Sequence, residues 1–250
     1  MTDSENKSFS IDVCFLIASS AKKSYQKLSE TYSAIEPPTW ALLLAQSCRS
    51  AGFKVNIIDA NAENLSEKEV LNRINILKPK IVCLVVYGQN VNAGTANMRG
   101  AVDISEFLKN NKKDLQIAFV GSHVQALPIE TLKKEKSIDI VFTNEGVYAI
   151  RNLLRLKDFS SNNLKNIKGI AYRSENEIKI NLPEKVVPTE KMDIDLPGYA
   201  WDLLPYKERP LDLYRSPMWH AEYDFEKRSP YASLQTSLGC VFKCDFCMIN

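Results

Sequence analysis

The chain has 250 residues, of which 45% are hydrophobic and 25% are charged, a composition that is ordinary for a globular protein and excludes extensive disorder. Its formal net charge is +2, so no face has to be strongly basic and a nucleic-acid partner is not indicated. The sequence contains no apolar run near the roughly 18 residues of a membrane span, and its polar start is unlike a secretory signal. We therefore expect a cytoplasmic protein with no membrane or nucleic-acid partner.

Strands and helices alternate in the first part of the chain. Apolar runs predict five strands buried on both faces, at residues 11–18, 54–58, 81–86, 116–120 and 138–142, of which the first and third are the most continuous. The segments between and after them predict helices at residues 40–50, 66–77, 96–110, 129–134 and 147–156. Thr39 is the expected N-cap of the first helix and Gly52 follows its end. Ser66 and Glu69 have the spacing of a capping box at the start of the second helix.

Strands of this kind, separated by helices, indicate a parallel sheet with right-handed connections and helices on both faces. We therefore expect an α/β fold over residues 8–157, with a doubly wound, five-stranded parallel sheet of the Rossmann-like kind. Ligands of such sheets bind outside the carboxyl ends of the strands, which places the loops carrying Gly88, Gly121 and Gly146 at the binding edge. Asp59 ends the second strand, where a dinucleotide fold has its ribose-binding acid. No GxGxxG motif follows the first strand, so a nicotinamide cofactor is not expected.

A different pattern covers residues 158–230. Residues 167–173 and 177–181 predict a β-hairpin. The connector over residues 183–230 is rich in proline and aromatic residues and too apolar for a flexible linker, so we expect an ordered strap that covers a neighbouring surface. Its large apolar residues include Trp201, Leu203, Leu204, Tyr206, Tyr214 and Trp219. A predicted strand over residues 231–237 then leads into a loop rich in cysteine.

Cys240, Cys244 and Cys247 stand in CxxxCxxC spacing in this loop. Three thiolates at this spacing can hold three irons of a 4Fe-4S cluster and leave the fourth iron without a protein ligand. A zinc site is the weaker alternative, because zinc usually takes four ligands in CxxC pairs and no fourth cysteine or histidine lies near. The chain has six cysteines, and this clustering fits a reducing compartment better than a disulfide framework.

The cysteine loop resembles the cluster loop of the radical S-adenosylmethionine superfamily. The resemblance lies in the three cysteines, in residues 233–239 before them, and in Phe246 inside the second spacing. It implies that S-adenosylmethionine binds the open iron near Phe246 and is cleaved by one electron to a 5′-deoxyadenosyl radical, with an electron donor such as a flavodoxin or ferredoxin. It also implies that residues 231–250 begin a TIM-type barrel of which this sequence holds the first strand, so that this chain alone is expected to be inactive.

The whole chain resembles radical S-adenosylmethionine proteins that carry a cobalamin-binding domain before the barrel. The resemblance rests on the doubly wound sheet and on residues 120–123, 144–146 and 201–205, which read VGSH, NEG and WDLLP. It implies a bound cobalamin with these contact residues: Gly88, Gly121, Ser122, His123, Glu145 and Gly146. The DxHxxG motif, whose histidine ligates cobalt in some cobalamin enzymes, is absent, so we expect no histidine ligand to cobalt. The alternative for Gly121 and Gly146 is an ordinary turn glycine at a strand end.

These resemblances imply a cobalamin-dependent enzyme that methylates an unactivated carbon of a small molecule or biosynthetic intermediate, or that carries out another radical rearrangement. A non-catalytic cobalamin-binding module is one alternative. The other is a methylthiotransferase with a second cluster held by Cys14, Cys48 and Cys83. We expect Cys14 and Cys83 to lie in the core instead, because both stand in the middle of apolar strands.

Overall fold

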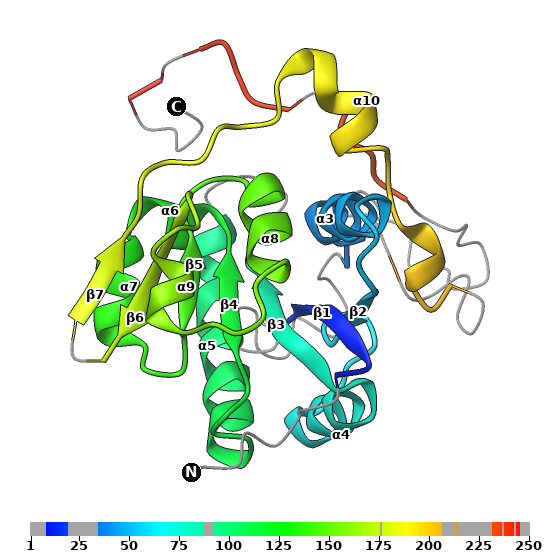
Figure 1. Cartoon of the computed structure of the whole chain (residues 1–250). Helices are drawn as coiled ribbons and strands as arrows, with labels where there is room; N and C mark the ends of the chain where they lie inside the picture. The colour runs from blue at the N-terminus through cyan, green and yellow to red at the C-terminus, as the bar shows by residue number, and fades with distance from the viewer. Residues whose placement is uncertain are drawn as a thin grey trace.

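A computed structural model of the protein describes residues 9–19, 35–87, 93–175, 177–206, 214, 232–236, 238–242 and 244–245. In this part of the chain, one sheet lies between two layers of helices, and a long segment after the last strand crosses over the helices of one layer (Figure 1). The elements in chain order are β1 (Ile11–Ile17), α3 (Thr39–Ser50), β2 (Val55–Asp59), α4 (Glu67–Leu77), β3 (Pro79–Val85), α5 (Ala93–Asn111), β4 (Ile117–Val120), α6 (Ser122–Ala126), α7 (Pro128–Lys134), β5 (Ile140–Phe142), α8 (Val147–Leu154), α9 (Ser161–Leu164), β6 (Ile170–Ser174), β7 (Glu177–Ile180), the 3-10 turn η1 (Thr189–Lys191), α10 (Met192–Asp195) and the 3-10 turn η2 (Trp201–Leu203).

In the described part of the chain, the sheet has seven strands in the order β2-β1-β3-β4-β5-β6-β7. The strands from β1 to β5 run parallel, which confirms the predicted doubly wound sheet. The β6–β7 hairpin also forms, but β6 pairs antiparallel with β5, with Ile140 opposite Tyr172 and Phe142 opposite Ile170. The hairpin therefore extends the sheet past residue 157, the predicted domain limit, because the open edge of β5 needs a partner for its backbone groups.

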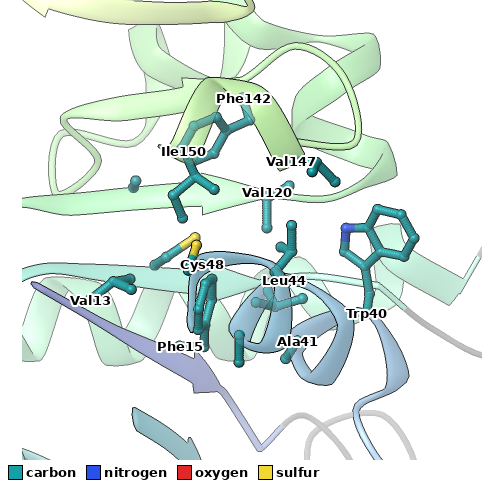
Figure 2. Packing of buried hydrophobic residues seen from close by; sticks show 14 of the residues in the cluster. Val13, Phe15, Trp40, Ala41, Leu44, Cys48, Val120, Phe142, Val147 and Ile150 are labelled. Atoms are coloured by element: carbon teal, nitrogen blue, oxygen red, sulfur yellow. The ribbon is translucent and has the colours of Figure 1, made fainter. Parts of the chain in front are cut away.

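Side chains of the strands alternate between two separate cores. On β1, Val13 and Phe15 enter the core shared with α3 and α8 (Figure 2), whereas Cys14 and Leu16 enter the core shared with α4 and α5. All four side chains are fully buried, and burying a large apolar side chain stabilises the fold by about 1.5–3 kcal/mol. A strand buried on both faces has a continuous apolar sequence, which explains why composition alone located β1.

The helix starts follow two different patterns. α4 begins at the predicted capping box, in which the Ser66 hydroxyl accepts from the Glu69 amide at 3.3 Å and the Glu69 carboxylate accepts from the Ser66 amide at 2.8 Å. The prediction of Thr39 as the N-cap of α3 is wrong. The N-cap is Pro38, because its carbonyl accepts the first helical hydrogen bond from the Leu42 amide at 3.0 Å.

Two further local features concern turns. Gly52 follows α3 as predicted and has φ of +90°, a conformation that is costly for other residues. The short helix α6 occupies Ser122–Ala126, where a loop was predicted, and α7 begins directly after it at Pro128. The segment after β4 is thus held close to the sheet rather than extending into solvent.

The strap predicted after the hairpin is ordered in its described part and passes over α8 and α3 (Figure 1). Four of its residues are buried in the core on that side of the sheet: Leu196, Ala200, Leu204 and Tyr214. Trp201, Leu203 and Tyr206 pack partly buried against the same core. Trp219 lies outside the described residues. The aromatic and apolar composition of the strap therefore has the expected cause, which is coverage of α3 and α8.

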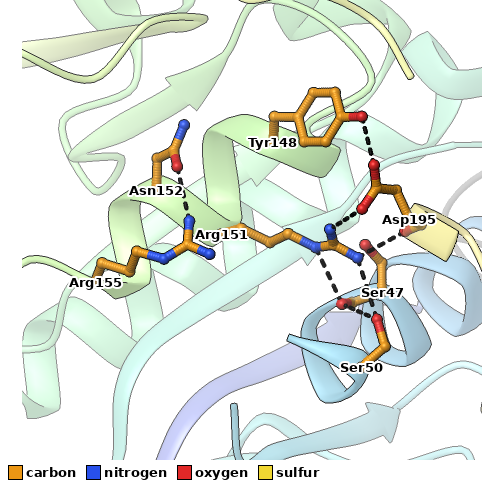
Figure 3. A network of polar contacts seen from close by, with 7 residues as sticks. All are labelled: Ser47, Ser50, Tyr148, Arg151, Asn152, Arg155 and Asp195. Carbon is orange, nitrogen blue, oxygen red and sulfur yellow. Dashed lines mark hydrogen bonds and ion pairs between the residues drawn. The ribbon is translucent and has the colours of Figure 1, made fainter. Parts of the chain in front are cut away.

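A buried arginine fastens the strap to the helices (Figure 3). Arg151 on α8 donates to the Asp195 carboxylate of α10 at 2.6 Å and to the Ser47 carbonyl of α3 at 3.1 Å. The Tyr148 hydroxyl donates to the second Asp195 oxygen at 2.6 Å. The hydrogen bond from Tyr148, with the Arg151 charge beside it, lowers the pKa of Asp195. One guanidinium group therefore joins α8, α3 and the strap.

The predicted strand over residues 231–237 is not formed in the part of that range that the structure describes. Residues 232–236 are not paired with any described strand, so they have no neighbouring strand with which to exchange backbone hydrogen bonds. Whether a barrel begins here stays a proposal. Among the described residues, no helix is long and apolar enough to cross a membrane.

Candidate functional site

The strand order creates a topological switch point at the carboxyl edge of the sheet, between β1 and β3. β2 lies on one side of β1 and β3 on the other, so the connections after β1 and β3 leave toward opposite faces and a ligand can bind between them. The loops that follow these two strands fall largely in residues 20–34 and 88–92, outside the described residues. Gly88 is among them. The described walls of the candidate site therefore come from the ends of β3, β4 and β5 and the starts of α3 and α5.

Backbone segments meet closely beside this switch point. A Cβ atom on Gly121 would lie 2.2 Å from the Val86 carbonyl oxygen, and one on Gly94 would lie 2.3 Å from the Ser122 hydroxyl. The end of β3, the start of α5 and the turn after β4 are thus in contact. Gly121 is required by this contact within the chain, and a role in admitting a cofactor stays a prediction. Ser122 is buried, and its backbone opens α6.

His123 stands at the same edge, in the first turn of α6. Its Nδ1 lies 3.3 Å from the Thr95 hydroxyl of α5. The side-chain amide of Asn97, also on α5, donates to the Tyr87 carbonyl at 3.0 Å. These contacts tie the start of α5 to the ends of β3 and β4. The ring of His123 is partly exposed, and its contact with a corrin or its tail stays a prediction.

Glu145 follows β5, and its carboxylate and carbonyl groups accept hydrogen bonds from other residues of the chain. Its carboxylate accepts from the Val187 amide of the strap at 3.0 Å, and its carbonyl accepts from the Trp40 indole at 3.0 Å. Burial raises the pKa of Glu145. The Trp40 and Tyr87 rings lie beside it, with centroids 5.6 Å apart. Glu145 therefore joins the strap to the turn after β5. The sequence did not indicate this contact, because Val187 is 42 residues away.

Gly146 has φ of +88°, a left-handed conformation, and is the N-cap of α8. Its amide donates to the Asn144 side chain at 3.0 Å. A Cβ atom at Gly146 would lie 3.2 Å from a methyl group of Val120. This glycine thus serves the turn between β5 and α8, and its contact with a cofactor stays a prediction.

The cysteine loop is described in part. Cys240 is exposed and Cys244 is half-buried, and both are free thiols. Cys247 and Phe246 lie outside the described residues. Two accessible thiols four residues apart suit iron, which cysteine thiolates ligate in 4Fe-4S clusters. The part of the chain that the structure describes contains no group of three potential metal ligands. A cluster held by Cys240, Cys244 and Cys247 stays a prediction.

The other cysteines form no second cluster site. Cys14, Cys48 and Cys83 are fully buried, as predicted for the two on strands. In the β1–β3 register Cys83 is opposite Phe15, whereas Cys14 is opposite Val82, so the two thiols point to opposite faces of the sheet. Burial raises the pKa of all three, that of Cys48 to about 12, which disfavours the thiolate that binds metal. These positions do not support a second cluster held by Cys14, Cys48 and Cys83, on which the methylthiotransferase alternative depends.

The Asp59 carboxylate at the end of β2 is buried and bonded within the chain, so it is not available to bind a ribose. It is 2% exposed, and its two oxygens accept from the Ala62 amide and from the Tyr214 hydroxyl, each at 3.0 Å. Burial raises the pKa of Asp59 to about 6, although both hydrogen bonds act in the opposite direction. Tyr214 lies 155 residues away along the chain, so no local pattern could have identified this pair.

A cavity of about 610 Å³ lies elsewhere, between α7 and the β6–β7 hairpin. Its polar lining includes Lys133, Lys136 and Arg173. The Arg173 amide bonds to the Asp139 carbonyl just before β5, so this cavity is at the amino edge of the parallel strands. It is therefore separate from the candidate site.

The family model described as B12 binding domain matches residues 26–154, just over half of the sequence. The chain therefore belongs to the B12-binding domain family. This finding agrees with the doubly wound sheet and with the switch point in its strand order.

Two relatives found by sequence comparison are longer proteins than this chain. The chain is 28% identical over 211 residues to an uncharacterized methyltransferase of Pyrococcus horikoshii, covering 84% of this chain and 40% of the relative. It is 23% identical over 211 residues to the anaerobic magnesium-protoporphyrin IX monomethyl ester cyclase of Synechocystis, covering 84% of this chain and 38% of that one. The chain thus spans about two fifths of the length of these relatives.

The fold is also that of a solved structure, the cobalamin-dependent S-adenosylmethionine radical enzyme OxsB with aqua-cobalamin and S-adenosylmethionine bound. The TM-score is 0.52 at 17% identity, over 75% of this chain and 25% of OxsB. The predicted cobalamin-binding domain is confirmed by the family match, and its Rossmann-like fold agrees with this solved structure.

Proposed function

We propose that this chain is the cobalamin-binding part of a cobalamin-dependent radical S-adenosylmethionine enzyme that methylates an unactivated carbon of a small molecule or biosynthetic intermediate. The observation that carries the proposal is the continuity of one polypeptide from a B12-binding domain, through an anchored strap, to a CxxxCxxC loop. The name of the Pyrococcus relative supports methyl transfer. An electron donor such as a flavodoxin or ferredoxin and a cytoplasmic location belong to the same proposal.

Each part of the chain has a role in this scheme. Cys240, Cys244 and Cys247 would hold a 4Fe-4S cluster, and the carboxyl edge of the sheet near His123 would hold cobalamin. When bound, cobalamin, the cluster and S-adenosylmethionine supply a methyl group and a radical that activates a carbon–hydrogen bond. The accessible thiols of Cys240 and Cys244 are free to bind iron. Glu145 would keep the strap attached to the turn after β5, since its carboxylate accepts from the Val187 amide.

Binding of the two metal cofactors can be tested on this chain. The chain is purified under anaerobic conditions, supplied with iron and sulfide, and measured for iron per chain and for hydroxocobalamin retained after gel filtration. We expect Cys240→Ala to lose iron and Cys48→Ala, a matched change of a buried thiol, to retain it. Both variants should retain the corrin. Iron that survives the loss of Cys240 would contradict the cluster site, and a chain that retains no corrin would contradict the cobalamin site.

The Synechocystis relative, named as a cyclase, favours a second candidate, a radical reaction other than methyl transfer. The two candidates differ in the fate of the methyl group of S-adenosylmethionine. The longest protein that contains this chain is incubated with S-adenosylmethionine carrying a deuterated methyl group and with a reductant, in an extract of the organism's small molecules. A deuterated methyl group in a product supports methyl transfer. Release of 5′-deoxyadenosine without any deuterated product supports the other reaction.

A further inference from the structure

Four aromatic residues of the strap form a continuous row of ring contacts, which we name the aromatic ladder: Tyr199, Trp201, Tyr206 and Tyr214. Successive ring centroids are 5.3, 6.3 and 5.3 Å apart, and all three pairs are tilted. Tilted pairs at such distances are favourable contacts, because the positive edge of one ring meets the negative face of the other. The ladder therefore holds together parts of the strap that are up to 15 residues apart, from 199 to 214.

One end of the ladder is fixed in the sheet. The Tyr214 hydroxyl donates to the Asp59 carboxylate at 3.0 Å, and both residues are 2% exposed. Asp59 is the last residue of β2. A hydrogen bond to a charged, buried acceptor is stronger than one at the surface. This end of the ladder is thus anchored at the carboxyl edge of the sheet.

The other end of the ladder holds the cysteine loop. The Tyr199 hydroxyl accepts from the Gln235 amide at 2.8 Å and donates to the Gln235 carbonyl at 3.3 Å. A neighbouring antiparallel strand would bond to both backbone groups of one residue in the same way. The phenol therefore takes the place of a strand partner at Gln235, five residues before Cys240.

The middle of the ladder is braced on α3. The Ala200 amide donates to the Leu42 carbonyl at 3.3 Å, and Arg49 binds Asp202 through two hydrogen bonds of 2.7 and 2.9 Å. These contacts flank Trp201 on both sides. The ladder thus rests on a helix that also covers the core, and it has little freedom to move independently of the sheet.

The cysteine loop itself buries little. Leu234, Val241 and Phe242 are 64%, 90% and 70% exposed, so apolar packing within the described residues does not fix the loop. Its placement depends on polar contacts such as those made by Tyr199.

We propose that the aromatic ladder is a positioning element that ties the cysteine loop to the carboxyl edge of the sheet, with Tyr199 as the residue that holds the loop. The importance of this position for a cluster rests on the proposed function, but the contact itself exists without a cofactor. In the full reaction the ladder would set the separation between the cluster and the cofactor of the B12-binding domain.

The first test is amide hydrogen exchange at Gln235 in the chain without cofactors. Tyr199→Phe keeps the ring but removes the hydroxyl and thus both hydrogen bonds to Gln235. Only one of them is donated by the Gln235 amide, and its loss should make exchange of this amide about tenfold faster. Tyr172→Phe on β6 removes a hydroxyl outside the ladder and should leave this exchange unchanged. The global stability against urea should change little in Tyr199→Phe, which distinguishes a local positioning role from a general one. Unchanged exchange at Gln235 would overturn the proposal.

The second test asks whether the far end of the ladder matters. Tyr214→Phe removes the bond to Asp59, and we expect it to speed exchange at Gln235 severalfold. The double variant with Tyr199→Phe should add nothing to the effect of Tyr199→Phe alone, because both act on one contact. Effects that multiply, or a Tyr214→Phe variant with normal Gln235 exchange, would show that the loop is held locally and that the ladder does not transmit position. These outcomes need no bound cofactor, so they stay distinct from failure of the proposed function.

A third measurement connects the ladder to the cluster. In the chain supplied with iron and sulfide, Tyr199→Phe should bind as much iron as the wild type but give a broader electron paramagnetic resonance spectrum of the reduced cluster, because the loop adopts more than one position. An identical spectrum would show that the ligands alone set the cluster geometry and would contradict a positioning role of Tyr199 there.

Discussion

Replacing Asp59 by asparagine should remove a pH-dependent cost that the wild type carries at neutral pH. Asparagine has the shape of aspartate, and its oxygen can accept from Ala62 while its amide donates to the Tyr214 hydroxyl. The variant thus keeps both contacts but places no charge in this buried position. The prediction concerns the difference in unfolding free energy between the two chains as the pH changes.

The magnitude follows from the pKa of Asp59. Burial raises it from 3.8 to about 6, so between these values the folded chain retains a proton that the unfolded chain has released. Stability then falls as the pH rises, because folding takes up a proton. The whole effect is about 3 kcal/mol, since one pKa unit corresponds to 1.36 kcal/mol. About 1.3 kcal/mol of it falls between pH 5 and pH 7.

The assay is urea unfolding of wild type and Asp59→Asn at pH 5 and pH 7, with the linear extrapolation of the unfolding free energy. Other groups with shifted pKa values, such as Glu145 and Asp195, are present in both chains and cancel in the difference. We expect the variant to gain about 1.3 kcal/mol relative to wild type on going from pH 5 to pH 7. A difference that is independent of pH, or one that shifts toward the wild type, would show that the hydrogen bonds to Asp59 outweigh its burial.

Three further predictions concern stability, each measured by urea unfolding at pH 7. Asp195→Asn leaves the buried Arg151 without its charge partner and should cost about 3 kcal/mol; a loss under 1 kcal/mol would show that the remaining backbone acceptors suffice. Gly121→Ala forces a Cβ atom against the Val86 carbonyl and should cost about 1–3 kcal/mol, and an unchanged stability would show that β3 and β4 separate freely there. Ser66→Ala should cost about 1 kcal/mol through the lost cap of α4, and a neutral result would show that this helix end is already frayed.

Much of the sheet could be predicted from the sequence because its causes are local. The strands β1 and β3 are continuous apolar runs, and α4 begins at a capping box whose two residues are three positions apart. The pairing of β6 with β5 could not be predicted, because a strand's sequence does not specify which neighbour it bonds. The N-cap of α3 was misplaced by one residue, because Thr39 has the preferred side chain but Pro38 has the first acceptor.

The candidate site was predictable to different degrees. The spacing of Cys240, Cys244 and Cys247 predicts a metal loop, since cluster ligands lie close together in the sequence. The use of Glu145 as an anchor for Val187 was not predictable, and neither was the pair of Asp59 with Tyr214. Both join residues that are far apart along the chain, and only the folded strap brings them together.

The strand β7 has a consequence for how this chain behaves at high concentration. Among the described residues it ends the row of strands and bonds only to β6, so its other side offers backbone groups that a strand of a second molecule could join. Ile180 adds an exposed apolar side chain, but Glu177 and Lys179 alternate with the isoleucines and pair with each other at 2.8 Å. Charges at an open edge oppose pairing between molecules, and these two residues therefore protect the sheet from aggregation rather than strengthening it.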